Sequence, residues 1–201
     1  MSRIYNINNH LMKYNDSCIN YIDPLNPLGL PGNTIRVKIL GGYTPGVSNA
    51  DKVKLVDSQN NVWDIYKKFN YWDFLFTNNN VVLEVLGANT TNVTSMDSTF
   101  QNCRWLSSVS LFDTSNLVDA ESMFRNCTEL TSIPLYDTSK VSNMNSMFSN
   151  CYRVQSGALA LYQQASSQTK PPSDHTQTFY NCGSNTQTGS AELAQIPSDW
   201  K

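Results

Sequence analysis

A phrase that returns with a fixed period constrains the fold of this chain more than any other feature. The sequence VTSMDSTFQNC (residues 93–103) reappears as LVDAESMFRNC (117–127) and as VSNMNSMFSNC (141–151). Each copy ends in a cysteine, and these cysteines are evenly spaced with a 24-residue period. A fixed period of this length is typical of proteins built from stacked repeats, because one unit can bury its apolar residues only against its neighbours.

Each repeat contains a strand-like phrase. Residues 106–111 and 130–135 share the spacing L-x-x-[VI]-x-L, and residues 82–85 begin in the same way. Apolar residues at this spacing predict a short strand whose alternate side chains point into the repeat. Asp-Thr-Ser follows at residues 113–115 and 137–139 and predicts turns, because these short side chains bond to nearby backbone amides.

Each repeat also contains a helix-like phrase. Met144, Met147, Phe148 and Cys151 follow the spacing i, i+3, i+4, i+7, which corresponds to one face of an α-helix. We expect these positions to form a core ladder, and we interpret the cysteines as small buried apolar residues rather than as disulfides. The predicted ladder consists of Met96, Phe100, Cys103, Met123, Phe124, Cys127, Met144, Met147, Phe148, Cys151, Phe179 and Cys182.

These patterns predict an α/β solenoid as the fold class. It would be a short leucine-rich-repeat stack of 24-residue strand-turn-helix coils, with an N-terminal β-containing cap region and a C-terminal helical cap. Four parts are expected. They are an irregular N-terminal attachment arm with one strand (1–50), an N-terminal cap with a degenerate first coil (51–80), the repeats (81–182) and a C-terminal cap (183–201).

The region before the repeats contains three local signals. Polar and β-branched residues alternate in residues 34–40, which predicts a strand. Residues 53–56 and 62–65 flank a turn-rich interval, which predicts a hairpin. Phe76 lies one full period before Phe100, so we expect the surrounding segment to act as an atypical first repeat.

The region after the repeats departs from the period. The interval from Cys151 to Cys182 is longer than the regular interval between the earlier cysteines. Residues 157–165 predict a helix in place of the strand-like phrase, and residues 190–195 predict a second short helix. We expect Trp200 to cover the last repeat, since terminal repeats must close a core that would otherwise be open.

Composition narrows the classes of function. Charged residues make up only 15% of the chain and the net charge is −2, so the clustered Lys and Arg that nucleic acid requires are missing. No apolar run could span a bilayer and no secretory signal is recognisable, so we expect no membrane insertion. The two histidines and five cysteines fit no metal-ligand spacing, and common catalytic motifs are absent. We therefore expect no enzyme, no cofactor and no metal.

The phrase DTSKVSNMNSMFSNC (residues 137–151) closely resembles the BspA-type leucine-rich repeat. The family pattern M-F-x-x-C lies at residues 147–151, and the resemblance extends over about residues 82–182. Such repeats occur in bacterial surface adhesins and in phages that infect gut Bacteroidales. The end of the chain, from residue 157, also resembles a C-terminal module of such proteins. The resemblance implies a protein displayed on a cell surface or on a virus particle.

The short array and the missing export signal and wall anchor favour a phage virion component, such as a head or tail fibre or a decoration protein. It would be assembled in the host cytoplasm and would present a rigid leucine-rich-repeat knob. Its expected partners are other virion proteins or further copies of itself, bound through the N-terminal region, and a glycan or protein on the host surface. The alternatives are a bacterial surface adhesin or carbohydrate- or protein-binding module, and an intracellular scaffold.

A candidate ligand-binding strip follows from the strand-like phrases. Residues that would point outward occupy equivalent positions in two repeats, so stacking would align aromatic rings beside hydroxyl groups. Such a surface suits a sugar ring or a protein partner. In the alternative interpretation, the two rings pack against the adjacent loop or the helix of residues 157–165 and cover the core. The candidate strip consists of Ser108, Ser110, Phe112, Ser132, Pro134 and Tyr136.

Overall fold

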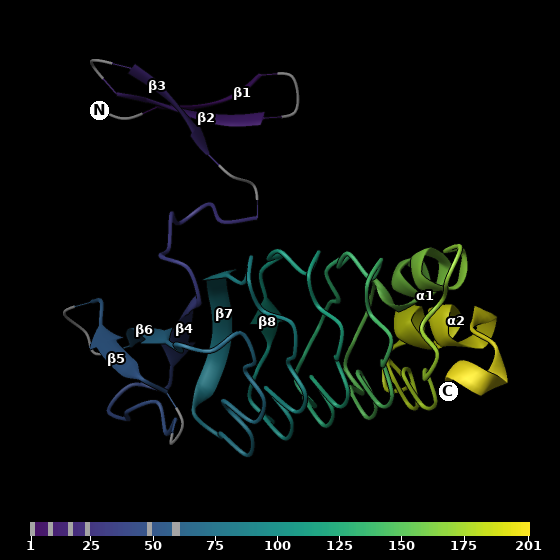
Figure 1. Ribbon diagram of the computed structural model, residues 1–201. Coiled ribbons are helices and arrows are strands. Elements are labelled where there is room, and N and C mark those ends of the chain that lie inside the picture. The colour runs from purple at the N-terminus through teal and green to yellow at the C-terminus, as the bar shows by residue number, and fades with distance from the viewer. Residues whose placement is uncertain (1–2, 8–9, 16–17, 23–24, 48–49, 58–60) are drawn as a thin grey trace.

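The computed structural model contains two β-sheets, two short α-helices and a long series of hydrogen-bonded turns (Figure 1). It describes the backbone of residues 3–7, 10–15 and 18–22, and the backbone and side chains of residues 25–47, 50–57 and 61–201. The side chain of Cys18 and most of the turn expected at residues 57–61 lie outside the described residues. No helix among the described residues is long and apolar enough to cross a membrane.

The first sheet is antiparallel and belongs to the N-terminal region. Strands β1 (Arg3–Ile7), β2 (His10–Asn15) and β3 (Cys18–Ile22) pair in chain order. Each contacts only its neighbours in this sheet among the strands and helices of the structure. With β4 (Thr34–Ile39), the described part of residues 1–50 thus contains four strands where the sequence predicted one.

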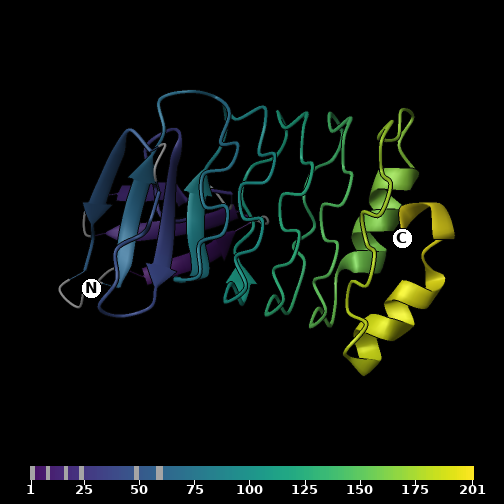
Figure 2. The ribbon, with the colours of Figure 1, turned by 90° about the horizontal axis from the view of Figure 1, so that it is seen from below.

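The second sheet has five strands in the order β5-β6-β4-β7-β8. β4 is the strand predicted at residues 34–40. β5 (Lys52–Leu55) and β6 (Val62–Tyr66) form the predicted antiparallel hairpin. β7 (Val82–Asn89) pairs with β4 on one side and, in parallel, with the two-residue β8 (Ser108–Val109) on the other. This mixed sheet closes one end of the turn series (Figure 2).

The repeated segments lie side by side between the sheet and the helices (Figure 1). Phe76 N donates to Thr99 O at 2.8 Å, and Phe100 N donates to Met123 O at 2.8 Å, so bonds join positions about one period apart. The predicted alignment of Phe76 with Phe100 is confirmed, since their rings stack with centroids 5.3 Å apart. Isolated parallel bridges join, in turn, Tyr71, Ser95, Asp119, Asn143 and Asp174.

The predicted α/β solenoid of strand-turn-helix coils is wrong, because the helix-like phrases form turns. Phe148 N donates to Thr178 O in the following segment, whereas Ser149 N donates to Ser146 O three residues back. Amide groups thus alternate between the next segment and their own turn, and the i−4 bonds of an α-helix are missing from these described phrases. Left-handed residues cause this. They occur at Phe74, Asn78, Ser98, Asn102, Ser122, Asn126, Ser146, Asn150, Gln177 and Asn181.

The strand-like phrases also differ from the prediction. Residues 106–111 contribute only β8, and residues 130–135 contribute a single bridge between Ser132 and Ser156. Leu111 and Leu135, predicted to point inward, are 40% and 55% exposed. The regular sheet of this part of the chain is therefore confined to β4–β8, and a five-stranded mixed sheet with two short helices replaces the predicted repeating sheet.

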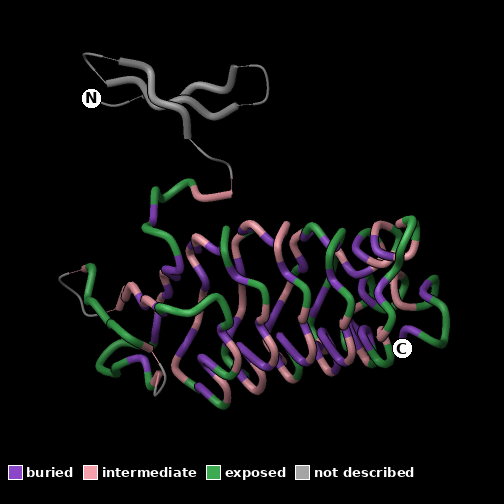
Figure 3. The backbone as a smooth tube through the Cα atoms, viewed as in Figure 1, coloured by how far each residue is buried: buried purple, intermediate pink, exposed green. Residues whose placement is uncertain are grey.

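Buried positions recur from one repeated segment to the next (Figure 3), and their apolar side chains form one core cluster. Phe100, Phe124 and Phe148 stack with centroids 5.2 Å apart and with nearly parallel ring planes. The thiols of Cys103, Cys127 and Cys151 each donate to a main-chain carbonyl of the preceding segment, at 3.1 Å. Every residue of the predicted core ladder is buried.

Two helices and the C-terminus close the other end. The predicted helix of residues 157–165 is α1 (Ala158–Ser166), and α2 (Gln187–Gln195) begins three residues before its predicted start. Gly157 precedes α1 with φ of 100°, and a Cβ there would lie 2.1 Å from Ile133 O. Trp200, in the 3₁₀ turn η1 (Ser198–Trp200), is buried and stacks on Phe179, as predicted.

Replacing Phe124 with Ala will test the ring ladder. Phe124 stacks on a ring on either side, so its loss leaves a cavity that neighbouring segments cannot fill. We expect the free energy of unfolding to fall by about 3–5 kcal/mol, measured by urea denaturation. Tyr180→Ala is the control, because Tyr180 is 43% exposed, and its effect should stay within about 0.5 kcal/mol. Equal effects of the two changes would refute the importance of the ladder.

Asn126 will test the left-handed positions. Its backbone φ is 60°, and its side-chain amide lies in a ladder, donating to Asn102 Oδ1 at 2.7 Å and accepting from Asn150 Nδ2 at 3.0 Å. Asn126→Ala loses these bonds and strains the backbone, so urea denaturation should give a loss of about 2–3 kcal/mol. Asn126→Gly loses only the bonds and should cost about 1 kcal/mol less. A larger loss for Gly than for Ala would contradict this account.

Candidate functional site

The predicted aromatic strip does not lie on the surface. Phe112 and Tyr136 are each only 1% exposed, and their ring centroids are 5.1 Å apart. The ring of Tyr136 also lies 6.3 Å from that of Phe124, so it belongs to the core. The two rings therefore cover the core, as in the alternative interpretation, and they do not form the expected exposed aromatic strip.

A tight turn explains the position of Tyr136. Tyr136 N donates to Pro134 O at 2.9 Å, only two residues back. Such a γ-turn breaks the strict alternation of a strand, so Leu135 faces solvent and Tyr136 faces inward. Of the remaining strip residues, Ser108, Ser110 and Pro134 are partly buried, and Ser132 is exposed.

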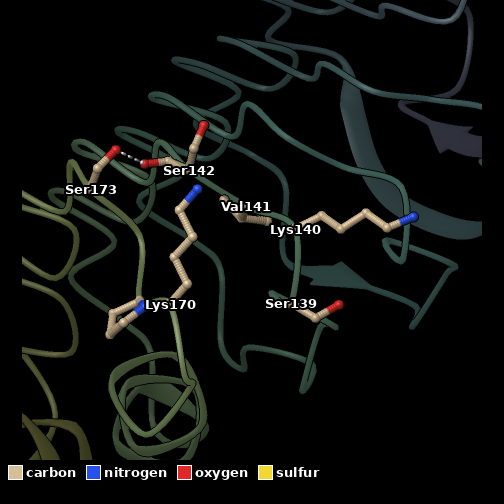
Figure 4. A pocket seen from close by; sticks show the side chains of 7 residues that line it. Ser139, Lys140, Val141, Ser142, Lys170 and Ser173 are labelled. Carbon is tan, nitrogen blue, oxygen red and sulfur yellow. Dashed lines mark hydrogen bonds between the residues drawn. The ribbon is translucent and has the colours of Figure 1, made fainter.

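A groove next to this position is the best candidate site. It consists of two adjoining pockets that share Ser139 and Lys170, with volumes of about 250 and 560 Å³. One wall is the turn at residues 137–142, and the other is the segment at residues 164–173, which includes the end of α1 (Figure 4). We name these two pockets together the 139/170 groove.

Hydrogen bonds across the groove fix its walls. Gln164 Nε2 donates to Tyr136 O at 2.9 Å, and Gln168 Nε2 donates to Thr138 Oγ1. At the other end, Ser173 Oγ donates to the main-chain oxygen of residue 142 at 3.0 Å. Hydrogen bonds therefore join the two walls at both ends of the groove in the absence of a ligand.

The 137–142 wall is shaped by the predicted Asp-Thr-Ser turn. Asp137 Oδ1 accepts a hydrogen bond from Ser139 N at 2.8 Å, and the equivalent Asp113 Oδ1 accepts from Ser115 N at 2.9 Å. These bonds confirm the two turns. They leave Ser139 exposed at the point where the two pockets meet.

The two lysines of the smaller pocket have different surroundings. Lys140 Nζ donates to Asn116 Oδ1 at 2.6 Å in the preceding repeat, so its charge points away from the groove (Figure 4). Lys170 extends toward Ser142 (Figure 4) and makes no hydrogen bond or ion pair with any residue that the structure describes. Among the described residues, no carboxylate lines this smaller pocket. It therefore presents one uncompensated positive charge.

The larger pocket is rich in hydrogen-bond acceptors. Gln164 Oε1 and Gln168 Oε1 lie behind the pocket wall, buried without a partner among the described residues. Ser167 Oγ donates to Gln164 O at 3.1 Å, so its proton is already in use. Asp137 supplies a carboxylate to this pocket. Such walls suit a ligand that brings its own donors.

The sequence prediction missed the groove residues, although one signal pointed to them. The interval before Cys182 is longer than the regular period, and insertions in repeat proteins form loops on one face, which is often the binding face. The Lys-Pro-Pro-Ser sequence that follows α1 lies in this lengthened interval.

The described thiols are unsuited to nucleophilic catalysis. Burial raises the pKa of Cys103 and of Cys151 to about 12, and it raises the pKa of Cys127 and Cys182 as well. These four thiols are therefore protonated at neutral pH and cannot act as thiolate nucleophiles. Among the described residues, no group of His, Cys, Asp and Glu is arranged to hold a metal ion.

Acidic residues from successive segments lie near one another along the turns. Partial burial, and then the nearby carboxylates of Glu121 and Asp73, raise the pKa of Asp119. Asp119 Oδ1 accepts a hydrogen bond from Glu121 N at 3.0 Å. One period later, Asn143 Oδ1 accepts the same bond from Asn145 N at 3.0 Å. Position 143 thus holds a neutral amide in the same geometry, and we expect position 119 to accept one as well.

Asp119→Asn should therefore stabilise the protein at pH 7. An aspartate whose pKa is raised on folding favours the folded state below its unfolded pKa, and this benefit is lost as pH rises through the folded pKa. We expect a melting temperature up to about 2 °C higher at pH 7, and a gain that shrinks at acidic pH as both states become protonated. A gain of the same size at pH 7 and pH 3 would contradict this explanation.

Comparison with known proteins identifies one family. Residues 70–191 match the model of DUF285, described as a Mycoplasma protein of unknown function. No curated protein and no solved structure matches the chain. The matched residues include all the repeated turns and both walls of the 139/170 groove. Because this match covers more than half of the 201 residues, the chain belongs to the DUF285 family.

Proposed function

We propose that the chain is a non-enzymatic structural and interaction protein, in which the repeated turns form a rigid spacer between an attachment region and a recognition surface. The observation that carries this proposal is the continuous series of main-chain bonds across the repeats. Phe124 N donates to Met147 O at 2.9 Å, and Phe148 N continues the series to Thr178 O at 2.8 Å. A core bonded and stacked in this way resists bending.

The N-terminal sheet is the proposed attachment region. Among the described strands and helices, β2 contacts β1 and β3, and none of the three contacts another element. A small sheet gains stability when an apolar face packs against another element. We infer that this sheet packs either on a second copy of the chain or on other proteins of a particle or cell surface.

Two placements fit this role. The first is a phage virion component, such as a fibre or decoration protein, and it rests on the resemblance of the repeats and the C-terminal module to phage proteins. The second is a bacterial surface adhesin. The Mycoplasma origin in the description of DUF285 favours this second placement. In both cases the distal end would meet a glycan or protein of a host.

The absence of catalysis is part of the proposal. The four described thiols are buried and protonated. The 139/170 groove offers hydroxyl groups, amides and an ammonium group, which are groups that bind and orient a ligand. We expect no turnover of any ligand that binds there.

Fractionation of the producing cells will test the proposed role. Antibodies against the chain should detect it on purified particles or on the outer cell surface, where external protease removes the signal. A cytosolic enzyme from the same lysate is the control and should resist that protease. Mass spectrometry of purified particles separates the two placements. Detection only as a free cytosolic protein would refute both placements.

A further inference from the structure

We infer that the 139/170 groove binds an acidic saccharide, with a carboxylate or sulfate group of one sugar at Lys170 and a neutral sugar in the larger pocket. This inference rests on the proposed interaction role and specifies its ligand. It follows from three properties of the groove, namely its charge, the orientation of its hydroxyl groups and its size.

The charge of the groove selects an anion at one end. Lys140 is bound to Asn116, so Lys170 is the cation available in the smaller pocket among the described residues. The groove carboxylate, Asp137, lines the larger pocket and not the smaller one. An anionic group is therefore favoured beside Lys170, where a charge-assisted hydrogen bond can form, and is disfavoured beside Asp137.

The hydroxyl groups select a ligand that carries hydrogen-bond donors. Ser142 Oγ donates to Val118 O at 3.2 Å, and Ser173 Oγ donates to the main-chain oxygen of residue 142 at 3.0 Å. With their protons in use, these oxygens can only accept. Inorganic sulfate or a fully ionised phosphate would bring only acceptors to them. A sugar hydroxyl group brings the donor that they need.

The same argument applies to the larger pocket. The amide donors of Gln164 and Gln168 are bound to Tyr136 O and Thr138 Oγ1, and their Oε1 atoms have no partner among the described residues. Asp137 adds a further acceptor. A neutral sugar supplies hydroxyl donors to the Asp137 carboxylate, whereas a second anion would be repelled by it; the buried Gln164 and Gln168 oxygens hold no proton that could attract an anion.

The dimensions of the groove fit two sugar rings. Small-molecule sites typically have volumes of roughly 300–1,000 Å³. The smaller pocket, at about 250 Å³, holds one ring, and the larger, at about 560 Å³, continues past Ser139. The adjoining pockets thus accommodate a disaccharide whose acidic ring lies nearest Lys170.

Titration of the full chain with matched disaccharides will test this inference. The probes are cellobiose, cellobiouronic acid and cellobiose 6-sulfate, measured by calorimetry at low salt. We expect both acidic probes to bind at least tenfold more tightly than cellobiose. Lys170→Gln should weaken the acidic probes by about 10- to 100-fold and leave the cellobiose affinity unchanged. Ser173→Ala should weaken all three probes.

The control is Lys54→Gln, which removes the same charge from exposed strand β5, outside the groove. Its melting temperature and that of Lys170→Gln should match the unmodified chain, and its affinities should be unchanged. The inference is overturned if both lysine variants lose affinity equally, if cellobiose binds as tightly as the acids, if none of the probes binds, or if inorganic sulfate binds as tightly as the sugars. The fractionation result does not depend on these probes, so a surface protein that binds none of them would refute only this inference.

Discussion

The structure depends on one constraint, the alternation of main-chain amide groups between two kinds of acceptor. In each repeated turn, every second N–H donates to the following segment, and those between them close a turn within their own segment. Left-handed residues, such as Ser146 and Asn150, make this alternation possible. The alternation also fixes the separation of the segments. The phenylalanine rings stack with centroids 5.2 Å apart because the backbones that bear them are one strand spacing apart. Backbone geometry thus determines the packing of the core.

The failed helix prediction follows from the same geometry. Three overlapping four-residue turns bring the side chains of Met144, Phe148 and Cys151 to the buried side of the backbone, as one face of a helix would. The spacing of apolar residues therefore identifies the core, and it cannot distinguish a helix from a series of turns. Asn150, which belongs to a residue type that tolerates positive φ, was the available indication of a turn. Helix α1 was predictable, since residues 158–166 are rich in strong helix formers and contain no residue that requires positive φ.

The candidate site was harder to predict from the sequence than the core. The γ-turn before Tyr136 reverses the alternation of the strand-like phrase, and nothing in the L-x-x-I-x-L spacing indicates this reversal. The 139/170 groove depends on contact between residues 137–142 and 164–173, which are separated by a repeat phrase and a helix. An insertion predicts that a loop exists. Long-range hydrogen bonds, such as that from Ser173 Oγ to the main-chain oxygen of residue 142, decide which part of the chain the loop packs against.

Gly157 determines where the strand-like phrases end and helix α1 begins. At this position the chain approaches Ile133 O too closely for any side chain, turns with a positive φ and begins α1, while Trp200 covers the last ring. At the opposite end, the edge strand β5 carries Lys52 and Lys54, charges that discourage another strand from adding there. The series of repeated segments therefore has a fixed length and is closed at both ends. Gain or loss of one repeat phrase in evolution would move the groove by one strand spacing, about 4.8 Å, without altering either end.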